Sequence, residues 1–120
     1  MVAAARDIEK IFKALGDPTR RKVMERLYRG PASLTELAQP FEMALPSFYQ
    51  HVRQLEDCGL VESSKQGRVR TYTATLAPVQ AAEDWLSRQR KVWEKRLDQF
   101  DEYVMKLKDQ HEKQQEKQHD

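Results

Sequence analysis

The sequence has little of several residue types on which common functional sites depend. It contains one cysteine, Cys58, together with three histidines and four glycines among 120 residues. A single cysteine cannot form a disulfide within the chain, which excludes a small domain held together by disulfides. Soft-metal sites need thiolates or imidazoles that converge, and this set of side chains is too small and too scattered to supply them. The composition therefore predicts no metal site and no cofactor.

Long apolar runs and a dominant charge sign are also missing. No run approaches the roughly 20 apolar residues needed to cross a bilayer, and the amino terminus has no basic segment followed by an apolar signal core. We therefore expect a cytoplasmic protein with no membrane contact. The formal net charge is +2, but the basic bias is confined to residues 1–32 and 61–75. Such a bias permits an anionic partner without requiring one.

The side chains that an enzyme would need are not arranged for catalysis. An active site requires a pocket with a positioned nucleophile, acid or metal, and no glycine loop that could cradle a phosphate is present. Glu56 and Asp57 are adjacent, so at helical spacing they point about 100° apart. Solvated surface is the better interpretation of both acids, and we expect no enzymatic activity.

Helical periodicity dominates what the sequence does contain. Apolar residues recur on one face before Gly16 and predict a first helix over residues 7–15. Asp17 and Pro18 are typical of the start of a second helix, one as the cap and the other in the first turn. Its expected buried stripe consists of Val23, Met24, Leu27 and Tyr28. Ser33 and Glu36 form a capping box that begins a short third helix.

The stretch PSFYQHVRQLEDCG, residues 46–59, predicts an amphipathic helix that ends at the glycine. Phe48, Val52 and Leu55 recur at i, i+4 and i+7 and define its buried face. In a DNA major groove, Gln can bind adenine and Arg can bind guanine, each through two hydrogen bonds. Considered alone, such residue types are more typical of a solvated helix surface. The polar candidates on this helix are Ser47, Tyr49, Gln50 and Arg53.

Two short extended runs follow, LVESS and RVRTYTA, and they predict a β-hairpin over residues 61–74. Lys65, Arg68 and Arg70 lie at or beside its turn, where side chains could reach DNA phosphates or a minor groove. We interpret Tyr72 as a core residue at the hairpin base. Helix, turn, helix and hairpin make a winged helix-turn-helix, a mainly α fold with a small β-hairpin (α+β).

A long last helix is predicted from about Pro78 to beyond residue 105. Its apolar stripe could pack within its own domain, but it continues for several turns after a compact domain should be complete, which favours pairing of two such helices. We therefore expect a homodimer, with a DNA-binding and dimerisation domain over residues 1–108 and a polar, disordered tail over residues 109–120. The expected interface residues are Ile8, Ile11 and Phe12 of the first helix and Leu86, Trp93, Leu97, Phe100 and Val104 of the last.

Two segments resemble a known family over roughly residues 6 to 105. ALGDPTRRKVMERL is similar to the first conserved helix entry of the ArsR-family transcriptional regulators, and ALPSFYQHVRQLEDCGLVESSKQGRVRTYTA is similar to their recognition helix and wing. The resemblance implies a homodimeric repressor that is released by a signal. It implies binding to an inverted-repeat operator in double-stranded DNA through the recognition helix 46–58 and the basic wing 61–74. By position it places Ser47, Tyr49, Gln50 and Arg53 at the DNA, with Arg68 and Arg70 on the wing.

The chain departs from the metal sensors of that family. Those often carry paired cysteines in the helix before recognition, or His and carboxylate ligands in the last helix. Here the corresponding helix reads LTELAQP, and the last helix has no His before residue 111. The inducer is therefore unknown and is not expected to be a thiolate-bound metal. The alternative function is a winged-helix protein-interaction module without specific DNA binding, which would present an apolar or acidic recognition surface where this wing is basic.

Overall fold

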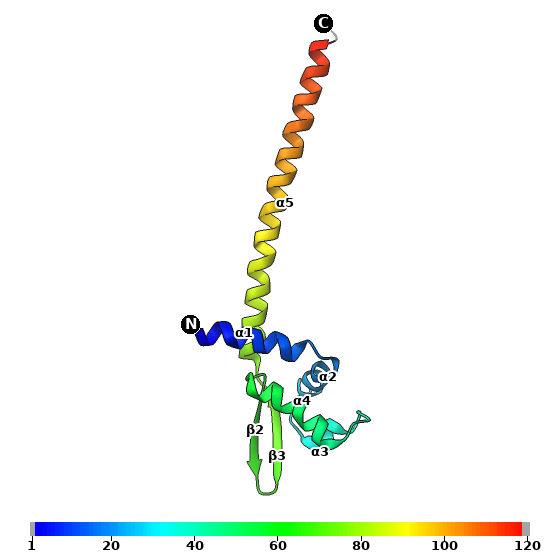
Figure 1. Cartoon of the computed structure of the whole chain (residues 1–120), viewed down its shortest axis with the longest axis vertical. Helices are drawn as coiled ribbons and strands as arrows, with labels where there is room; N and C mark the ends of the chain where they lie inside the picture. The colour runs from blue at the N-terminus through cyan, green and yellow to red at the C-terminus, as the bar shows by residue number, and fades with distance from the viewer. Residues whose placement is uncertain (1, 119–120) are drawn as a thin grey trace. The chain divides into compact units, whose positions relative to one another are not determined.

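The computed structural model describes the backbone of residues 2–118 and the side chains of residues 8–116. The chain divides into two units, one up to Glu83 and one from Asp84, and each is described by itself. A mainly helical chain with one small sheet confirms the predicted fold class (Figure 1). The elements are α1 (Val2–Leu15), α2 (Pro18–Leu27), β1 (Ala32–Ser33), α3 (Leu34–Ala38), α4 (Leu45–Asp57), β2 (Val61–Gln66), β3 (Val69–Ala74) and α5 (Leu76–Gln118).

Local signals set the helix boundaries in the first unit. Asp17 caps α2, because its carboxylate accepts the backbone N–H of Arg20 at 3.1 Å. The capping box of α3 is present in both directions, with the Ser33 hydroxyl accepting the Glu36 amide and the Glu36 carboxylate accepting the Ser33 amide. Gly59 follows α4 with φ of 80°, a left-handed conformation that favours glycine after a helix. These three predictions are confirmed.

The sheet has one strand more than the predicted hairpin. Its order is β1-β3-β2 and all pairs are antiparallel. The hairpin was predicted from alternating residues, but β1 has only two residues and therefore no period that a sequence could reveal. It exists because Ala32 pairs with Tyr72 of β3, a contact between residues far apart in the chain.

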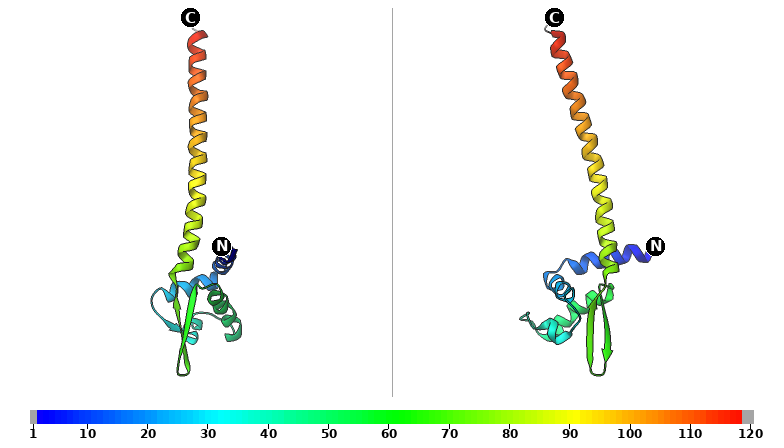
Figure 2. Two further views of the ribbon diagram at one scale, coloured as in Figure 1. Left: turned by 90° about the vertical axis from the view of Figure 1, so that its left-hand side faces the viewer. Right: turned by 180° about the vertical axis from the view of Figure 1, so that it is seen from behind.

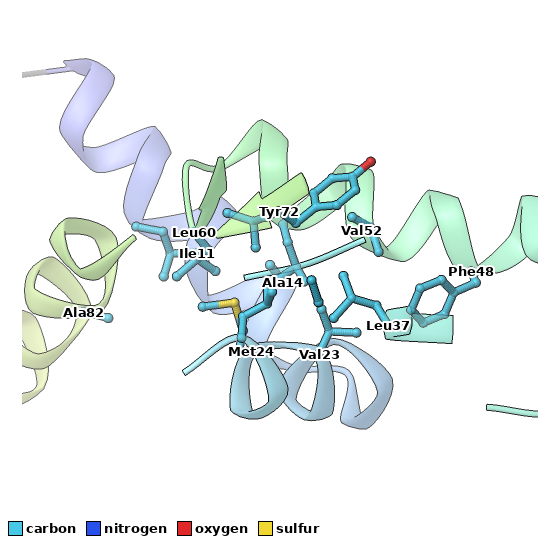
Figure 3. Packing of buried hydrophobic residues seen from close by; sticks show 14 residues of the cluster. Ile11, Ala14, Val23, Met24, Leu37, Phe48, Val52, Leu60, Tyr72 and Ala82 are labelled. Carbon is cyan, nitrogen blue, oxygen red and sulfur yellow. The ribbon is translucent and has the colours of Figure 1, made fainter. Parts of the chain in front are cut away.

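The core of the first unit gathers side chains from α1 to α4, the sheet and the start of α5 (Figure 3). Phe48, Val52 and Leu55 are fully buried, which confirms the predicted inner face of α4. Tyr72 is 1% exposed and is a core residue, as the sequence indicated. Tyr28 was expected in the buried stripe of α2, but it is 58% exposed because it lies at the C-cap, beyond the last buried turn.

The second unit is the part of α5 that follows Glu83. The helix continues to Gln118 and so includes most of the segment that the composition predicted to be disordered, while residues 119 and 120 lie outside the described residues. Two contacts, each between residues four positions apart, stabilise the last described turns of α5. They are an ion pair between Lys113 and Asp109 and a hydrogen bond between Gln115 and His111. Among the described residues, no helix combines the length and the apolar character that a membrane span requires.

Candidate nucleic-acid interface

Helix α4 presents the predicted recognition residues on its solvent face. Its buried residues follow the helical period, so the residues between them must point away from the core. The helix has no side-chain cap, and backbone N–H groups in its first turn are therefore open to an anionic oxygen. Among the first nine residues of α4, the predicted recognition residues Ser47, Tyr49, Gln50 and Arg53 are all exposed.

The hairpin of β2 and β3 forms the wing, and its tip extends beyond α3 and α4 in both views of Figure 2. Gly67 turns the chain at the tip with φ of 64°, which a side chain would strain. Lys65, Arg68 and Arg70 are all exposed there. Polar groups on such a projection can reach a molecule that lies against α4.

Two of the wing cations lie directly opposite each other. Lys65 pairs with Arg70 in the register of β2 and β3, so their side chains leave the same face of the hairpin. Alternation puts Ser63 and Tyr72 on that face as well, toward the core and α4. Like charges in direct cross-strand positions repel each other. A bound phosphate would relieve that repulsion.

A chain of hydrogen bonds joins the wing to α4. Arg70 donates from Nη1 to the Ser63 hydroxyl at 2.9 Å, and that hydroxyl donates to the Glu56 carboxylate at 2.8 Å. From the sequence, Glu56 was expected on the solvated surface, and Ser63 was given no role. Alternation along β2 could have indicated that Ser63 faces α4, since it lies two residues after the buried Val61. Glu56 and Ser63 therefore fix the orientation of the Arg70 guanidinium group.

A hollow lies between the solvent face of α4 and the wing. It is lined by Tyr49, Arg53, Glu56, Asp57 and Arg70. The structure thus brings three of the predicted site residues to one place, with Ser47 and Gln50 nearer the start of α4 and Lys65 and Arg68 nearer the wing tip. Two carboxylates and two guanidinium groups line the hollow, so their formal charges balance locally, and the Arg70 guanidinium is oriented by Glu56 through Ser63.

Tyr72 interacts electrostatically with three residues of this hollow, Glu56, Tyr49 and Arg70, and its phenol stays neutral. Burial raises the pKa of its phenol above the usual value, the negative charge of Glu56 and the presence of Tyr49 raise it further, and Arg70 partly offsets them. A neutral, buried ring at the base of the wing suits a structural role. It fixes the strand from which Arg70 projects.

A second polar junction fixes α4 to the two preceding helices. Arg20 is 8% exposed and donates to the carbonyl oxygens of Ala14 at 2.7 Å and Lys13 at 3.2 Å, at the end of α1. It also lies 3.0 Å from Nδ1 of His51 on α4. Because Arg can only donate, Nδ1 must be the accepting nitrogen in this contact. Sequence reasoning missed this junction, although Arg20 follows the Asp17 cap by three residues.

Asp17 takes part in the same junction. Its carboxylate lies 3.7 Å from His51 Nδ1 and accepts the Arg20 amide. Burial acts to raise the pKa of Asp17, but the backbone amides of Arg20 and Thr19 and the electrostatic interactions with His51 and Arg20 together outweigh burial and lower that pKa. The Asp17 carboxylate is therefore ionised at neutral pH.

The described side chains, residues 8–116, contain no group of three or more His, Cys, Asp or Glu residues that could hold a metal ion. Cys58 is half-buried at the end of α4, where its thiol lies 3.4 Å from the Leu55 carbonyl oxygen. Burial is the main cause that raises the pKa of the Cys58 thiol. A thiol of that kind is a poor nucleophile and a poor metal ligand at neutral pH.

Comparisons with known proteins agree with this geometry. A helix-turn-helix domain model matches residues 15–64, from the end of α1 into β2. The crystal structure of the ArsR family transcriptional regulator RHA00566 is 52% identical, with a TM-score of 0.72, over 75% of this chain and 93% of that one. The chain belongs to the ArsR family of transcriptional regulators. Proteins of this family regulate transcription and are not enzymes, as the sequence analysis expected.

Two further ArsR-type relatives extend the match. An ArsR-like transcriptional regulator from Rhodococcus sp. RHA1 is 30% identical, with a TM-score of 0.77, over 87% of this chain and 95% of that one. The transcriptional repressor SdpR of Bacillus subtilis is 27% identical over 79 residues, which cover 66% of this chain and 88% of SdpR. The ArsR-family assignment therefore applies to the wing and part of α5 as well as to the helix-turn-helix.

Proposed function

We propose that this ArsR-family protein is a homodimeric repressor that binds an inverted-repeat operator through α4 and the wing. The observation that carries the proposal is the shared hollow, where Tyr49 and Arg53 of α4 meet Arg70 of the wing. The repulsion between Lys65 and Arg70 adds to it, because a phosphate would be bound best between them. SdpR, a relative, is a transcriptional repressor, which supports repression as the outcome of binding.

The proposed homodimer matches the two-fold symmetry of an inverted-repeat operator. Two identical recognition helices read the two halves of an inverted repeat in the same way when a two-fold axis relates them. The proposed interface takes Ile8 and Phe12 from α1, which are half-buried, and the apolar stripe of α5. Ile11 was also expected there, but it is 2% exposed and packs in the core of its own chain, so it has little surface left for a partner.

The inducer in this proposal is not a thiolate-bound metal. One cysteine per chain and the raised pKa of its thiol both oppose such a site. A small molecule or no inducer at all is consistent with the chain.

The test is fluorescence anisotropy of the full chain with labelled duplex DNA from its own upstream region and a scrambled duplex as the control. We expect saturable binding at least a hundredfold tighter to the native duplex, with two chains per site. Gln50→Ala should cost about 1–3 kcal/mol on the native duplex if Gln50 binds a base through two hydrogen bonds, and much less on the scrambled duplex.

The matched variant is Gln54→Ala, one turn further along α4, because bases are contacted mainly from the first turns of a recognition helix. It should bind both duplexes like the unsubstituted protein. Equal losses on both duplexes for Gln50→Ala would contradict base recognition by this residue. Equally weak binding of the unsubstituted protein to every upstream duplex would favour the protein-interaction alternative.

A further inference from the structure

A second hollow lies on the first unit, between the end of α1 and the last turn of α4. Its volume of about 490 Å³ is within the range of small-ligand sites. With one exception, Asp57, its lining residues take no part in the DNA interface. The hollow is lined by Lys10, Lys13, Ala14, Gln54, Asp57 and Cys58.

The lining combines buried and exposed side chains. Ala14 is 2% exposed, and Cys58 is half-buried, with its thiol 3.4 Å from the Leu55 carbonyl oxygen. The exposed members are all polar or charged, and they are Lys10, Lys13, Gln54 and Asp57. The hollow is therefore suited to a small polar ligand rather than to an apolar one.

Two lysines of α1 line this hollow together. Lys10 and Lys13 are three residues apart, so they lie on the same face of the helix, where their like charges repel each other. Within the described side chains, residues 8–116, no carboxylate forms an ion pair with either lysine. The backbone beneath them is fixed, because the Lys13 carbonyl oxygen accepts from Arg20 at 3.2 Å. A negatively charged ligand could accept from both ammonium groups and relieve their repulsion.

The hollow stays open in the proposed homodimer. At about 100° per residue, Ile8 and Phe12 lie on one side of α1, and Lys10 and Lys13 lie on another, with about 150° between the two pairs. A partner that packs on Ile8 and Phe12 therefore leaves both lysines accessible to a ligand.

Asp57 connects this hollow with the DNA interface. It lines both hollows, the one with the two lysines and the one with Arg53 and Arg70. An anion beside the lysines would repel the Asp57 carboxylate and favour its rotation toward the two guanidinium groups. There the carboxylate would compensate positive charge that DNA phosphates otherwise meet. An anion in the hollow should thus weaken DNA binding, and DNA should weaken anion binding by the same factor.

We propose that the hollow between α1 and α4 binds a small dianion through Lys10 and Lys13, and that the bound dianion lowers DNA affinity through Asp57. The effect on DNA rests on the proposed function, whereas the anion site does not. The ligand chemistry is a pair of negative charges close enough to meet both ammonium groups, as in a short dicarboxylate or in inorganic phosphate. Such a ligand acts as an inducer of the proposed repressor.

The first experiment measures anion binding without DNA. Malonate and inorganic phosphate are titrated separately into the full chain at constant ionic strength and pH, and backbone amide chemical shifts are followed by NMR. We expect saturable shifts of the Ala14 and Cys58 amides with at least one anion, and none in Lys10→Gln combined with Lys13→Gln. A response to malonate alone identifies a dicarboxylate site, and a response to phosphate alone identifies a phosphate site. No saturable shift with either anion, or equal shifts in the double variant, would overturn the proposal.

Cys58 gives an independent readout of the charge in the hollow, because it is the only cysteine of the chain. Its reaction rate is measured with the dianionic reagent dithiobis(nitrobenzoate) and with the neutral reagent dithiodipyridine. Lys10→Gln combined with Lys13→Gln should lower the ratio of the two rates roughly threefold to tenfold. The ratio is used because a change in the pKa of Cys58, which burial raises, affects both reagents alike. Lys91→Gln combined with Lys95→Gln removes the same charge from the second unit and should leave the ratio unchanged.

The effect on DNA is measured by anisotropy with the native duplex. Malonate or phosphate is compared with sodium chloride at equal ionic strength, because salt alone weakens DNA binding. The anion that shifts the amides should lower DNA affinity at least fivefold in the unsubstituted protein. The same anion should have no such effect in Lys10→Gln combined with Lys13→Gln.

Asp57→Asn separates anion binding from its effect on DNA. Asparagine has no charge for the anion to repel, so the variant should keep the amide shifts and lose most of the fivefold effect. Asp98→Asn in the second unit is the matched control and should keep both. A full effect in Asp57→Asn would overturn the role of Asp57. If no upstream duplex is bound specifically while the anion still shifts the amides, the proposed function fails and the anion site stands.

Discussion

Ser63 is a small side chain that connects the wing with the recognition helix. Its hydroxyl accepts from Arg70 and donates to Glu56, so one oxygen serves two charged partners. Few residues could replace Ser63 in this role. A larger side chain would push Arg70 and Glu56 apart, and alanine has no hydroxyl to connect them. We therefore expect Ser63 to affect DNA binding indirectly, through the orientation of the Arg70 side chain.

Ser63→Ala should therefore weaken DNA binding by roughly threefold to tenfold, the equivalent of about 1 kcal/mol of lost positioning. The measurement is anisotropy with the native duplex, together with hydrogen exchange of the hairpin amides. Ser64→Ala is the matched control, because Ser64 is exposed and points to the opposite face of β2. Unchanged affinity for Ser63→Ala would show that Arg70 needs no support from Glu56.

Asp17 gives a prediction about pH. Asp17→Ala removes the cap of α2 and should lower the free energy of unfolding by about 0.5–2 kcal/mol at pH 7. Because the pKa of Asp17 is lowered in the folded protein, its charge stabilises the fold above the pKa of the unfolded chain, about 3.9. That contribution is lost as pH falls through the lowered folded pKa.

Denaturant unfolding at pH 7, 5 and 3 checks this sign. The difference between the unsubstituted protein and Asp17→Ala should be constant from pH 7 to 5 and should narrow at pH 3. Asp17→Asn keeps an oxygen that can cap the helix without the charge, so it should recover most of the stability at pH 7. A difference that widens toward low pH would contradict the lowered pKa.

At the scale of elements, the wing acts as a projecting cationic arm. Arg68→Ala should weaken binding to the native and scrambled duplexes alike and should reduce the slope of log affinity against log salt by about 0.9 per lost phosphate contact. Arg88→Ala changes the net charge equally but lies in the second unit, and it is the matched control. An unchanged slope for Arg68→Ala would remove Arg68 from the proposed contacts.

The elements also differ in how far sequence reasoning could reach them. α4 and the hairpin were predicted closely, because their periodicities of 3.6 and 2 residues can be recognised from residues that are close together in the sequence. Phe48, Val52 and Leu55 show this for α4. β1 was missed, since two residues carry no period and the strand exists only through its pairing with Tyr72. Tyr28 was wrongly predicted to be buried, because the helical periodicity of apolar residues does not reveal at which turn a helix extends beyond the core.

At the scale of the whole molecule, the boundary after residue 108 stays a prediction. The exposed apolar stripe of α5, which the proposed homodimer uses, ends at Leu107, so a chain truncated after residue 108 should dimerise like the full chain and bind the native duplex within about twofold of it. A chain truncated after residue 96 loses four apolar residues of that stripe, Leu97, Phe100, Val104 and Leu107, and should be monomeric. Light scattering and anisotropy distinguish the two, and a monomeric 1–108 chain would show that the last residues take part in pairing.

The sequence by itself determined the helices up to residue 108, the caps of α2 and α3, the hairpin and the exposed polar face of α4, because each depends on residues within a few positions of one another. The tertiary structure alone decided which side chains meet across elements: Arg20 with His51, and Ser63 with Glu56. Those pairs are 31 and 7 residues apart, and their partners are selected by how the elements pack. Local order follows from the covalent chain, whereas contacts between elements follow from the core that brings them together.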